Sequence, residues 1–141
     1  MSDPYDLQRF VDAQDGGTYE RALGELRAGR KTSHWMWFVL PQLAGLGRSA
    51  TAVRYAISGI EEAREYAAHP VLGPRYAECC EALLALGDVS TTDVLGPVDA
   101  AKLHSSLTLF GRAAPSPTIE ALLAQHHGGE PDPATLRLLD A

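Results

Sequence analysis

The sequence has few cysteines and no long hydrophobic run. Its two cysteines, Cys79 and Cys80, are neighbours, and neighbouring cysteines form only a strained disulfide and lack the spaced partners of a zinc site. We therefore expect reduced thiols in a cytoplasmic protein, with at least one of them in the core. No stretch approaches the roughly 18 apolar residues of a membrane-spanning helix, and the acidic start of the chain is unlike a signal peptide.

β-Branched residues are also scarce. The chain has 7 valines and 3 isoleucines against 21 alanines and 19 leucines, a balance that favours helix because β-branched side chains crowd the preceding helical turn. Polar and apolar side chains alternate only over short stretches, and there are no internal repeats. The sequence therefore predicts a single compact all-α domain over residues 1–141, with roughly seven to eight short helices packed orthogonally and no sheet.

Local start signals divide the chain into helical segments. These segments are predicted to begin near Asp3, Thr18, Ser33, Thr51, Ser58 (with Glu61 as a capping box), Leu72, Ser90, Asp99, Ser116 and Asp132. Most of them end at a glycine or before a proline. The segment at Ser90 is predicted to be a single turn.

Lysine is the scarcest charged residue, because Lys31 and Lys102 are the only two among 12 basic residues. With 18 acidic residues the formal net charge is -6. Such a balance argues against a general nucleic-acid-binding surface, which needs excess cations to displace counterions from phosphates. Arg21, Arg27, Arg30 and Lys31 would be the only candidates for a local basic stripe.

The segment from residue 30 to residue 42 is the least ordinary part of the chain. A cation there could take the charge of a ligand, an indole could stack on its ring, and an imidazole could move a proton. The predicted ligand-binding residues are Lys31, Ser33, Trp35, Trp37 and Gln42, and His34 is the candidate catalytic residue. The alternative is that the tryptophans belong to the core of a small domain.

Two further segments could contribute to such a site. The loop before residue 51 carries Gly47 and Arg48, which could bind an anion at a helix N-terminus, although a plain turn with a Ser49 or Thr51 cap is the simpler interpretation. A later segment carries Lys102, Ser106 and Thr108, whose polar groups could line a cleft or could bond to neighbouring backbone. We predict no metal site, because His126 and His127 are adjacent on one helix and cannot both face one ligand.

A further set of strings lies at residues 6–14, 33–38 with 41–42, 45–49, 62–63, 69–73, 75, 78–79, 102–103, 105–110 and 132–136. These strings resemble the bacterial domain-of-unknown-function 1810 family, often labelled "calpastatin". The resemblance implies an all-α, free-standing, intracellular single domain without an established function. Residues 125–129 depart from the family pattern, since an aromatic residue is expected before the glycines.

Two functions from different classes follow from these observations. The first is binding, and hydrolysis, of a small anionic ligand that is nucleotide-like, ADP-ribose-like or a sugar phosphate, in a pocket that combines lysine, histidine, tryptophan and arginine. The ADP-ribose part is an analogy with other small helical domains, without a residue-by-residue match. The second is a non-catalytic interaction or regulatory module, with a homodimer as one form. Neither requires a cofactor.

Overall fold

The computed structural model describes residues 3–140, which form ten helices and no strand. The helices are α1 (Gln8–Gln14), α2 (Thr18–Ala28), α3 (Met36–Val39), α4 (Ala50–Arg54), α5 (Ile60–Ala68), α6 (Leu72–Ala85), α7 (Thr91–Leu95), α8 (Pro97–Ala113), α9 (Pro117–His127) and α10 (Pro133–Leu139). Within this range the one β pairing is a parallel bridge between Leu43 and Ile57. The all-α prediction is confirmed, and the helix number is higher because α3, α4 and α7 have only four or five residues each.

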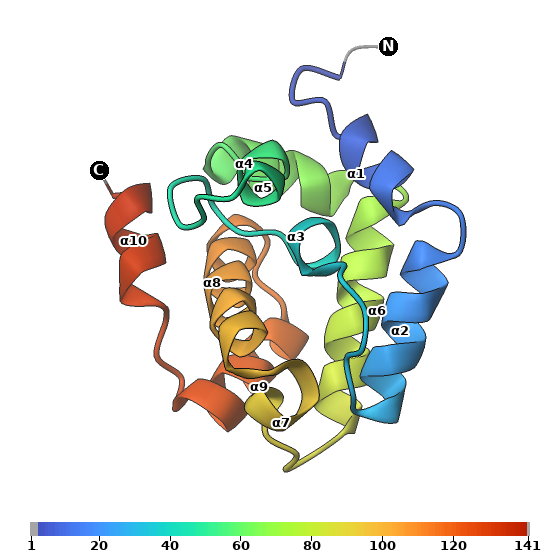
Figure 1. The fold of residues 1–141 in the computed structure, drawn as a ribbon. Helices are drawn as coiled ribbons and strands as arrows, with labels where there is room; N and C mark the ends of the chain where they lie inside the picture. The colour runs from blue at the N-terminus through green and yellow to red at the C-terminus, as the bar shows by residue number, and fades with distance from the viewer. Residues whose placement is uncertain (1–2, 141) are drawn as a thin grey trace.

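Helices α6 and α8 form the centre of the molecule (Figure 1). Helix α8 packs against α5, α7, α9 and α10, whereas α6 packs against α2, α5 and α9. Every residue of α8 from 105 to 110 is buried, and a helix that is buried on all sides lies inside a fold. In Figure 1, α5 runs across the ends of α6 and α8, which gives the steep crossings expected of an orthogonal arrangement.

Aromatic rings from four helices meet in the core. The ring centroid of Tyr66 lies 5.1 Å from that of Phe10 and 5.3 Å from that of Phe110, and Phe110 lies 4.3 Å from Tyr76. Edge-to-face and tilted pairs of this kind add to the stabilisation that burial alone provides. These contacts link α1, α5, α6 and α8.

The two cysteines lie beside these rings on α6. Both are free thiols and both are buried, as the sequence predicts. Burial raises the pKa of Cys79 to about 12, so this thiol stays protonated at neutral pH.

Several helix starts follow the local capping rules. The side chain of Ser90 accepts a hydrogen bond from Thr92 N–H, that of Ser116 from Ile119 N–H, and that of Asp132 from Thr135 N–H. The predicted starts at Ser90, Ser116 and Asp132 are therefore confirmed. Such caps satisfy backbone donors that the helix itself leaves free.

Three predicted caps are wrong by one to three residues. The observed N-cap residues are Gly17 in place of Thr18, Gly59 in place of Ser58, and Gly96 in place of Asp99. Gly17 and Gly96 have φ angles of 88° and 86°, in the left-handed region that glycine adopts at little steric cost. The chain therefore turns at the glycine, and the side chain that was predicted as a cap is free for other contacts.

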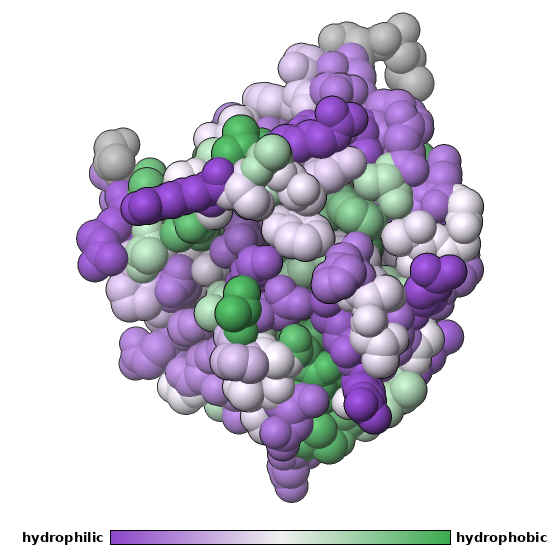
Figure 2. All heavy atoms as spheres, viewed as in Figure 1, coloured by the Kyte–Doolittle hydropathy of each residue, from purple (hydrophilic) through white to green (hydrophobic). Residues whose placement is uncertain are grey.

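The surface carries no large hydrophobic patch on the face that Figure 2 shows. Hydrophilic residues cover most of this face, and hydrophobic residues form small, separate groups between them. Between residues 3 and 140 the exposed large hydrophobic residues are Val53, Val89, Val98 and Leu138, and isolated apolar residues are normal on protein surfaces. Among residues 3–140, no helix combines the length and apolar character that crossing a membrane requires.

Candidate functional site

The two lysines and the two tryptophans of the chain meet around Asp99, in the first turn of α8. Lys31 Nζ lies 2.8 Å from Asp99 Oδ2 and 5.1 Å from the ring centroid of Trp35. Lys102 Nζ lies 3.4 Å from Asp99 Oδ1 and 4.7 Å from the ring centroid of Trp37. We call these five residues the lysine–tryptophan cluster. Its members come from two separate parts of the sequence, residues 31–37 and residues 99–102.

The cluster has a buried half and an outer half. The Lys31 side chain is 8% exposed and Trp35 is 1% exposed, so these two residues belong to the protein interior. The Lys102 side chain is 21% exposed, and Trp37 is partly exposed. Two cations share one carboxylate, and the cluster therefore carries a net charge of about +1 within an acidic protein.

Asp99 is the member of the cluster that the sequence predicted only as a helix cap. Its spacing of three residues from Lys102 places both side chains on one face of α8, a local signal that could have identified this pair. The contact with Lys31 has no local signal, because 68 residues of sequence separate Lys31 from Asp99.

Glu25 fixes the loop that carries the first half of the cluster. Its carboxylate accepts hydrogen bonds from Thr32 N–H at 2.8 Å, from the Ser33 hydroxyl and from Trp35 Nε1–H at 2.9 Å. Burial acts to raise the pKa of Glu25, but the hydrogen bonds outweigh it and lower this pKa to about 2. The predicted site residue Ser33 is thus engaged with Glu25, and Lys31 N–H donates to Val94 O at 2.7 Å.

Four other predicted site residues lie in exposed or partly exposed loops. His34 and Arg48 are exposed, and within residues 3–140 their side chains make no hydrogen bond or ion pair. Gln42 accepts a hydrogen bond at its carbonyl from Ile57 N–H at 2.9 Å, next to the β bridge. A Cβ at Gly47 would lie 2.5 Å from the Cβ of Ala52, so Gly47 permits the close approach of its loop to α4.

The two predicted hydroxyl residues on α8 are buried and bonded within the protein. Ser106 Oγ lies 2.9 Å from the hydroxyl of Tyr76. The Thr108 hydroxyl donates to His104 O and accepts from Asp132 N–H, both at 2.8 Å. These contacts attach α6 and the segment before α10 to α8.

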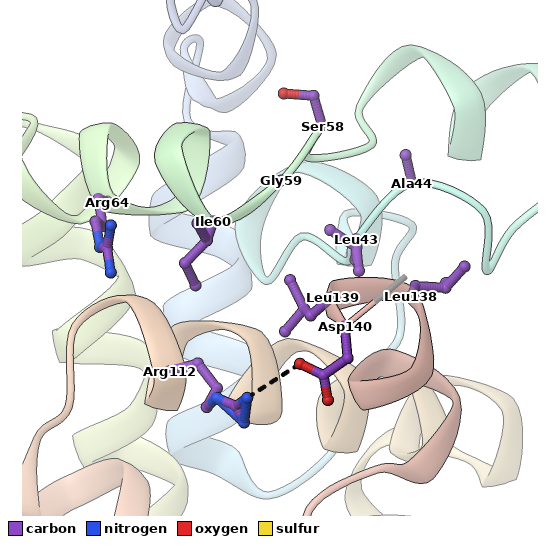
Figure 3. Close-up of a pocket in the computed structure, with 10 residues that line it drawn as sticks. All are labelled: Leu43, Ala44, Ser58, Gly59, Ile60, Arg64, Arg112, Leu138, Leu139 and Asp140. Carbon is purple, nitrogen blue, oxygen red and sulfur yellow. Dashed lines mark hydrogen bonds and ion pairs between the residues drawn. The ribbon is translucent and has the colours of Figure 1, made fainter.

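One surface cavity, of about 480 Å³, lies between the start of α5 and the end of α10 (Figure 3). Arg64 and Arg112 line it, and Arg112 Nη2 lies 3.4 Å from Asp140 Oδ1 across it. Its lining includes none of the predicted site residues. Because Arg64 also pairs with Glu61 at 3.0 Å, each arginine already has a carboxylate partner.

Three histidines gather where α8 meets α9. The rings of His104 and His127 stack at 3.8 Å with an angle of 2°, and the ring of His126 lies 6.5 Å from that of His127. Stacked rings cannot both direct a lone pair at one ion, because each lone pair lies in its own ring plane. Accordingly, residues 3–140 contain no group of three or more His, Cys, Asp or Glu side chains that could hold a metal ion.

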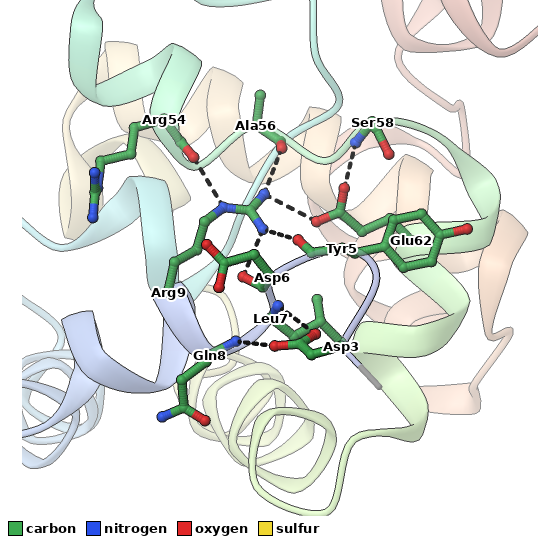
Figure 4. Close-up of polar contacts among 10 residues, drawn as sticks. All are labelled: Asp3, Tyr5, Asp6, Leu7, Gln8, Arg9, Arg54, Ala56, Ser58 and Glu62. Carbon is green, nitrogen blue, oxygen red and sulfur yellow. Dashed lines mark hydrogen bonds and ion pairs between the residues drawn. The ribbon is translucent and has the colours of Figure 1, made fainter. Parts of the chain in front are cut away.

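Arg9 forms a partly buried network that sequence reasoning missed (Figure 4). Its guanidinium donates to the carbonyl oxygens of Tyr5, Asp6, Arg54 and Ala56 and to the carboxylate of Glu62. All five N–H donors of the guanidinium are therefore used. The ion pair measures 2.9 Å, with Arg9 and Glu62 side chains 12% and 3% exposed.

This network also corrects the predicted start of the first helix. The helix begins at Gln8 rather than near Asp3. A helix that began near Asp3 would need a hydrogen bond from the backbone N–H of Arg9 to the carbonyl of Tyr5, but this carbonyl accepts its hydrogen bond from the Arg9 guanidinium. Asp6 has a φ of 52°, which interrupts helical geometry at that point. The carboxylate of Asp3 still accepts a hydrogen bond from Gln8 N–H at 3.0 Å.

Comparison with known proteins identifies similar chains without a described activity. The model of a family described as "Protein of unknown function (DUF1810)" matches residues 4–139. The crystal structure of the conserved hypothetical protein Rv1873 from Mycobacterium tuberculosis is 50% identical in sequence, covers 99% of each chain and superposes with a TM-score of 0.94. No curated protein matches the chain.

Proposed function

Since the chain belongs to the DUF1810 family of proteins of unknown function, its membership brings no activity with it, and we propose that the protein binds a small anionic ligand at the lysine–tryptophan cluster. The observation that carries this proposal is the presence of two lysines around one carboxylate, each lying over an indole ring. We place this activity in the cytoplasm, because two free buried thiols suit a reducing compartment.

The two lysines differ in burial and in distance from Asp99, and this difference supports an anion site. Lys31 is the nearer partner of Asp99 and is almost fully buried, so it neutralises the carboxylate. Lys102 is farther from Asp99 and more exposed, so its charge remains available to a ligand. At an effective dielectric of about 20, a unit anion some 4 Å away would gain ~4 kcal/mol of Coulomb energy before the cost of desolvation.

The tryptophan of the outer half supports a ligand that also has a flat ring. Trp37 is partly exposed and lies beside Lys102, so a ligand that reaches the ammonium group also reaches the indole. An anionic group joined to a planar ring is the chemistry of a nucleotide or of ADP-ribose. Ser33, which is bonded to Glu25, would then serve by shaping the loop before Trp35.

Hydrolysis of such a ligand would need a group that moves a proton, and His34 is the residue that we propose for this role. It precedes Trp35 directly and is exposed. Histidine is the side chain that enzymes use most often for general acid–base catalysis.

Tryptophan fluorescence gives a direct test, because both indoles of the chain belong to the cluster. AMP and ADP-ribose should change the fluorescence saturably and raise the melting temperature, and uncharged adenosine should bind far more weakly. The variant Lys102→Met keeps an apolar stem and removes the charge, so it should weaken AMP binding about tenfold. The variant Arg64→Met is the matched control, since Arg64 also pairs with a carboxylate three residues away.

The outcomes separate the two functions. Equal binding of adenosine and AMP, or unchanged binding by Lys102→Met, would contradict an anion site. A flat response to all three compounds would refute ligand binding here and favour the non-catalytic interaction module. If ADP-ribose or AMP is hydrolysed, His34→Ala should abolish turnover and leave the fluorescence titration unchanged.

A further inference from the structure

A second cavity, of about 270 Å³, lies among α5, α6, the end of α8 and the start of α9. Its inner wall is formed by Tyr76, Cys80, Phe110 and Ile119, each no more than 5% exposed. The rings of Tyr76 and Phe110 are 4.3 Å apart, so one side of the cavity is aromatic. The Tyr76 hydroxyl points to Ser106 at 2.9 Å, and the ring is therefore the part of Tyr76 that a ligand can contact.

Close packing of α5 against α6 fixes the shape of this cavity. A Cβ at Gly73 would lie 2.1 Å from the carbonyl oxygen of Ala67, so only glycine allows the two helices to approach at this point. Ala67, Gly73 and Ala77 line the cavity, and their small side chains leave the space open. A larger residue at the mouth would fill it.

The rim of the cavity is polar and acidic. Ser116 lines it but uses its hydroxyl to cap α9 through Ile119 N–H. Glu81 and Thr118 also line it, and across residues 3–140 neither side chain is engaged in a hydrogen bond or ion pair. The rim therefore offers one free carboxylate and one free hydroxyl next to an apolar interior.

We propose that this cavity binds a small aromatic amine. A cavity of about 150 Å³ lined by apolar side chains can hold benzene, so 270 Å³ suits one aromatic ring with a short tail. The ring would pack against Tyr76 and Phe110, where offset or edge contacts are favourable. The ammonium group would lie at the rim and donate to the carboxylate of Glu81.

This site is distinct from the lysine–tryptophan cluster in position and in charge. Asp99 and Phe110 are 11 residues apart on α8, which corresponds to ~16 Å along a helix. The cluster attracts anions through Lys102, whereas the rim of this cavity attracts cations through Glu81. Either site can therefore be present when the other is not.

Titration with three probes of one size tests the proposal. Phenethylamine should bind saturably and shift the amide NMR signals of α6 and of residues 114–119, phenethyl alcohol should bind more weakly, and phenylacetate should bind weakest. Glu81→Gln should weaken the binding of phenethylamine by roughly threefold to tenfold and leave the binding of phenethyl alcohol unchanged. Glu20→Gln, at an exposed glutamate of α2, is the charge-matched control.

Filling the cavity gives an independent readout. Ala77 is exposed at the mouth, so Ala77→Leu should preserve the fold and abolish binding of all three probes. Ala124→Leu, at an exposed alanine of α9, should bind them normally. Absence of saturable binding, a preference for phenylacetate, or normal binding by a folded Ala77→Leu variant would overturn the proposal.

Discussion

The network around Arg9 allows the sharpest prediction for stability. Replacing Arg9 by alanine leaves the carboxylate of Glu62, which is 3% exposed, without its ion-pair partner at 2.9 Å. The same change leaves four backbone carbonyls without the guanidinium donor. These carbonyls belong to the segment before α1, to the last residue of α4 and to the connection between α4 and α5 (Figure 4), so two parts of the chain lose their link.

Removal of one partner from a buried ion pair costs about 3–5 kcal/mol, because an uncompensated charge stays buried. We expect Arg9→Ala to lower the free energy of unfolding by this amount. At ~4 °C per kcal/mol for a chain of this size, the melting temperature should fall by about 12–20 °C. Arg9→Lys should recover only part of the loss, since an ammonium group has three donors and lacks the planar fork.

Urea unfolding followed by circular dichroism measures the change. Arg64→Ala is the matched control, because Arg64 also pairs with a glutamate, at 3.0 Å, but with side chains 54% and 69% exposed. The control should cost less than about 0.5 kcal/mol. An Arg9→Ala cost below ~1 kcal/mol, close to that of the control, would refute the claim that burial gives the Arg9 network its strength.

Three further predictions concern glycine packing and pH. Gly73→Ala should destabilise the fold by more than about 1 kcal/mol, because the new Cβ would lie 2.1 Å from the carbonyl oxygen of Ala67. Gly24→Ala, in the open interior of α2, should instead stabilise the fold by roughly 0.5–1 kcal/mol. Chemical denaturation of both variants checks that the two changes in unfolding free energy have opposite signs. The folded-state pKa of Glu25 is about 2 against an ordinary value of 4.5, so the stabilisation from Glu25 is complete above pH 4.5 and is lost as the pH falls towards 2. Glu25→Gln should therefore make the unfolding free energy depend less on pH over that window. An unchanged pH dependence would contradict the hydrogen-bond assignment. Burial lowers the pKa of His127 to about 4 from 6.5, so its contribution is complete above pH 6.5 and declines between pH 6.5 and pH 4; His127→Gln should remove this decline in the same measurement.

Local chemistry explains why much of the fold could be predicted. Ser116 and Asp132 start helices because a side-chain oxygen next to the first turn satisfies free N–H groups, which depends only on residues three positions apart. The leucines of α8 fall at helical spacing, so the buried face of the central helix was visible in the sequence. The shortage of valine and isoleucine similarly indicated helices rather than a sheet.

The candidate site was predictable only in part. Lys31, Trp35 and Trp37 were singled out because scarce residues cluster within a short segment. The same reasoning selected Lys102 independently, but its proximity to Trp37 at 4.7 Å depends on how α3 packs near α8. Nothing local indicated that Lys31 pairs with Asp99.

The sequence by itself thus determined the helical class, several helix starts and the scarcity that marks the lysines and tryptophans, because these features depend on composition and near-neighbour spacing. Tertiary structure alone decided that Arg9 pairs with Glu62 and that Asp99 pairs with Lys31, because donors and acceptors far apart in the chain meet only after the helices pack. It also decided that Ser106 and Thr108 use their hydroxyls inside the protein, bonded to Tyr76 and to the segment before α10. A polar side chain does not specify its partner until burial removes water as the alternative.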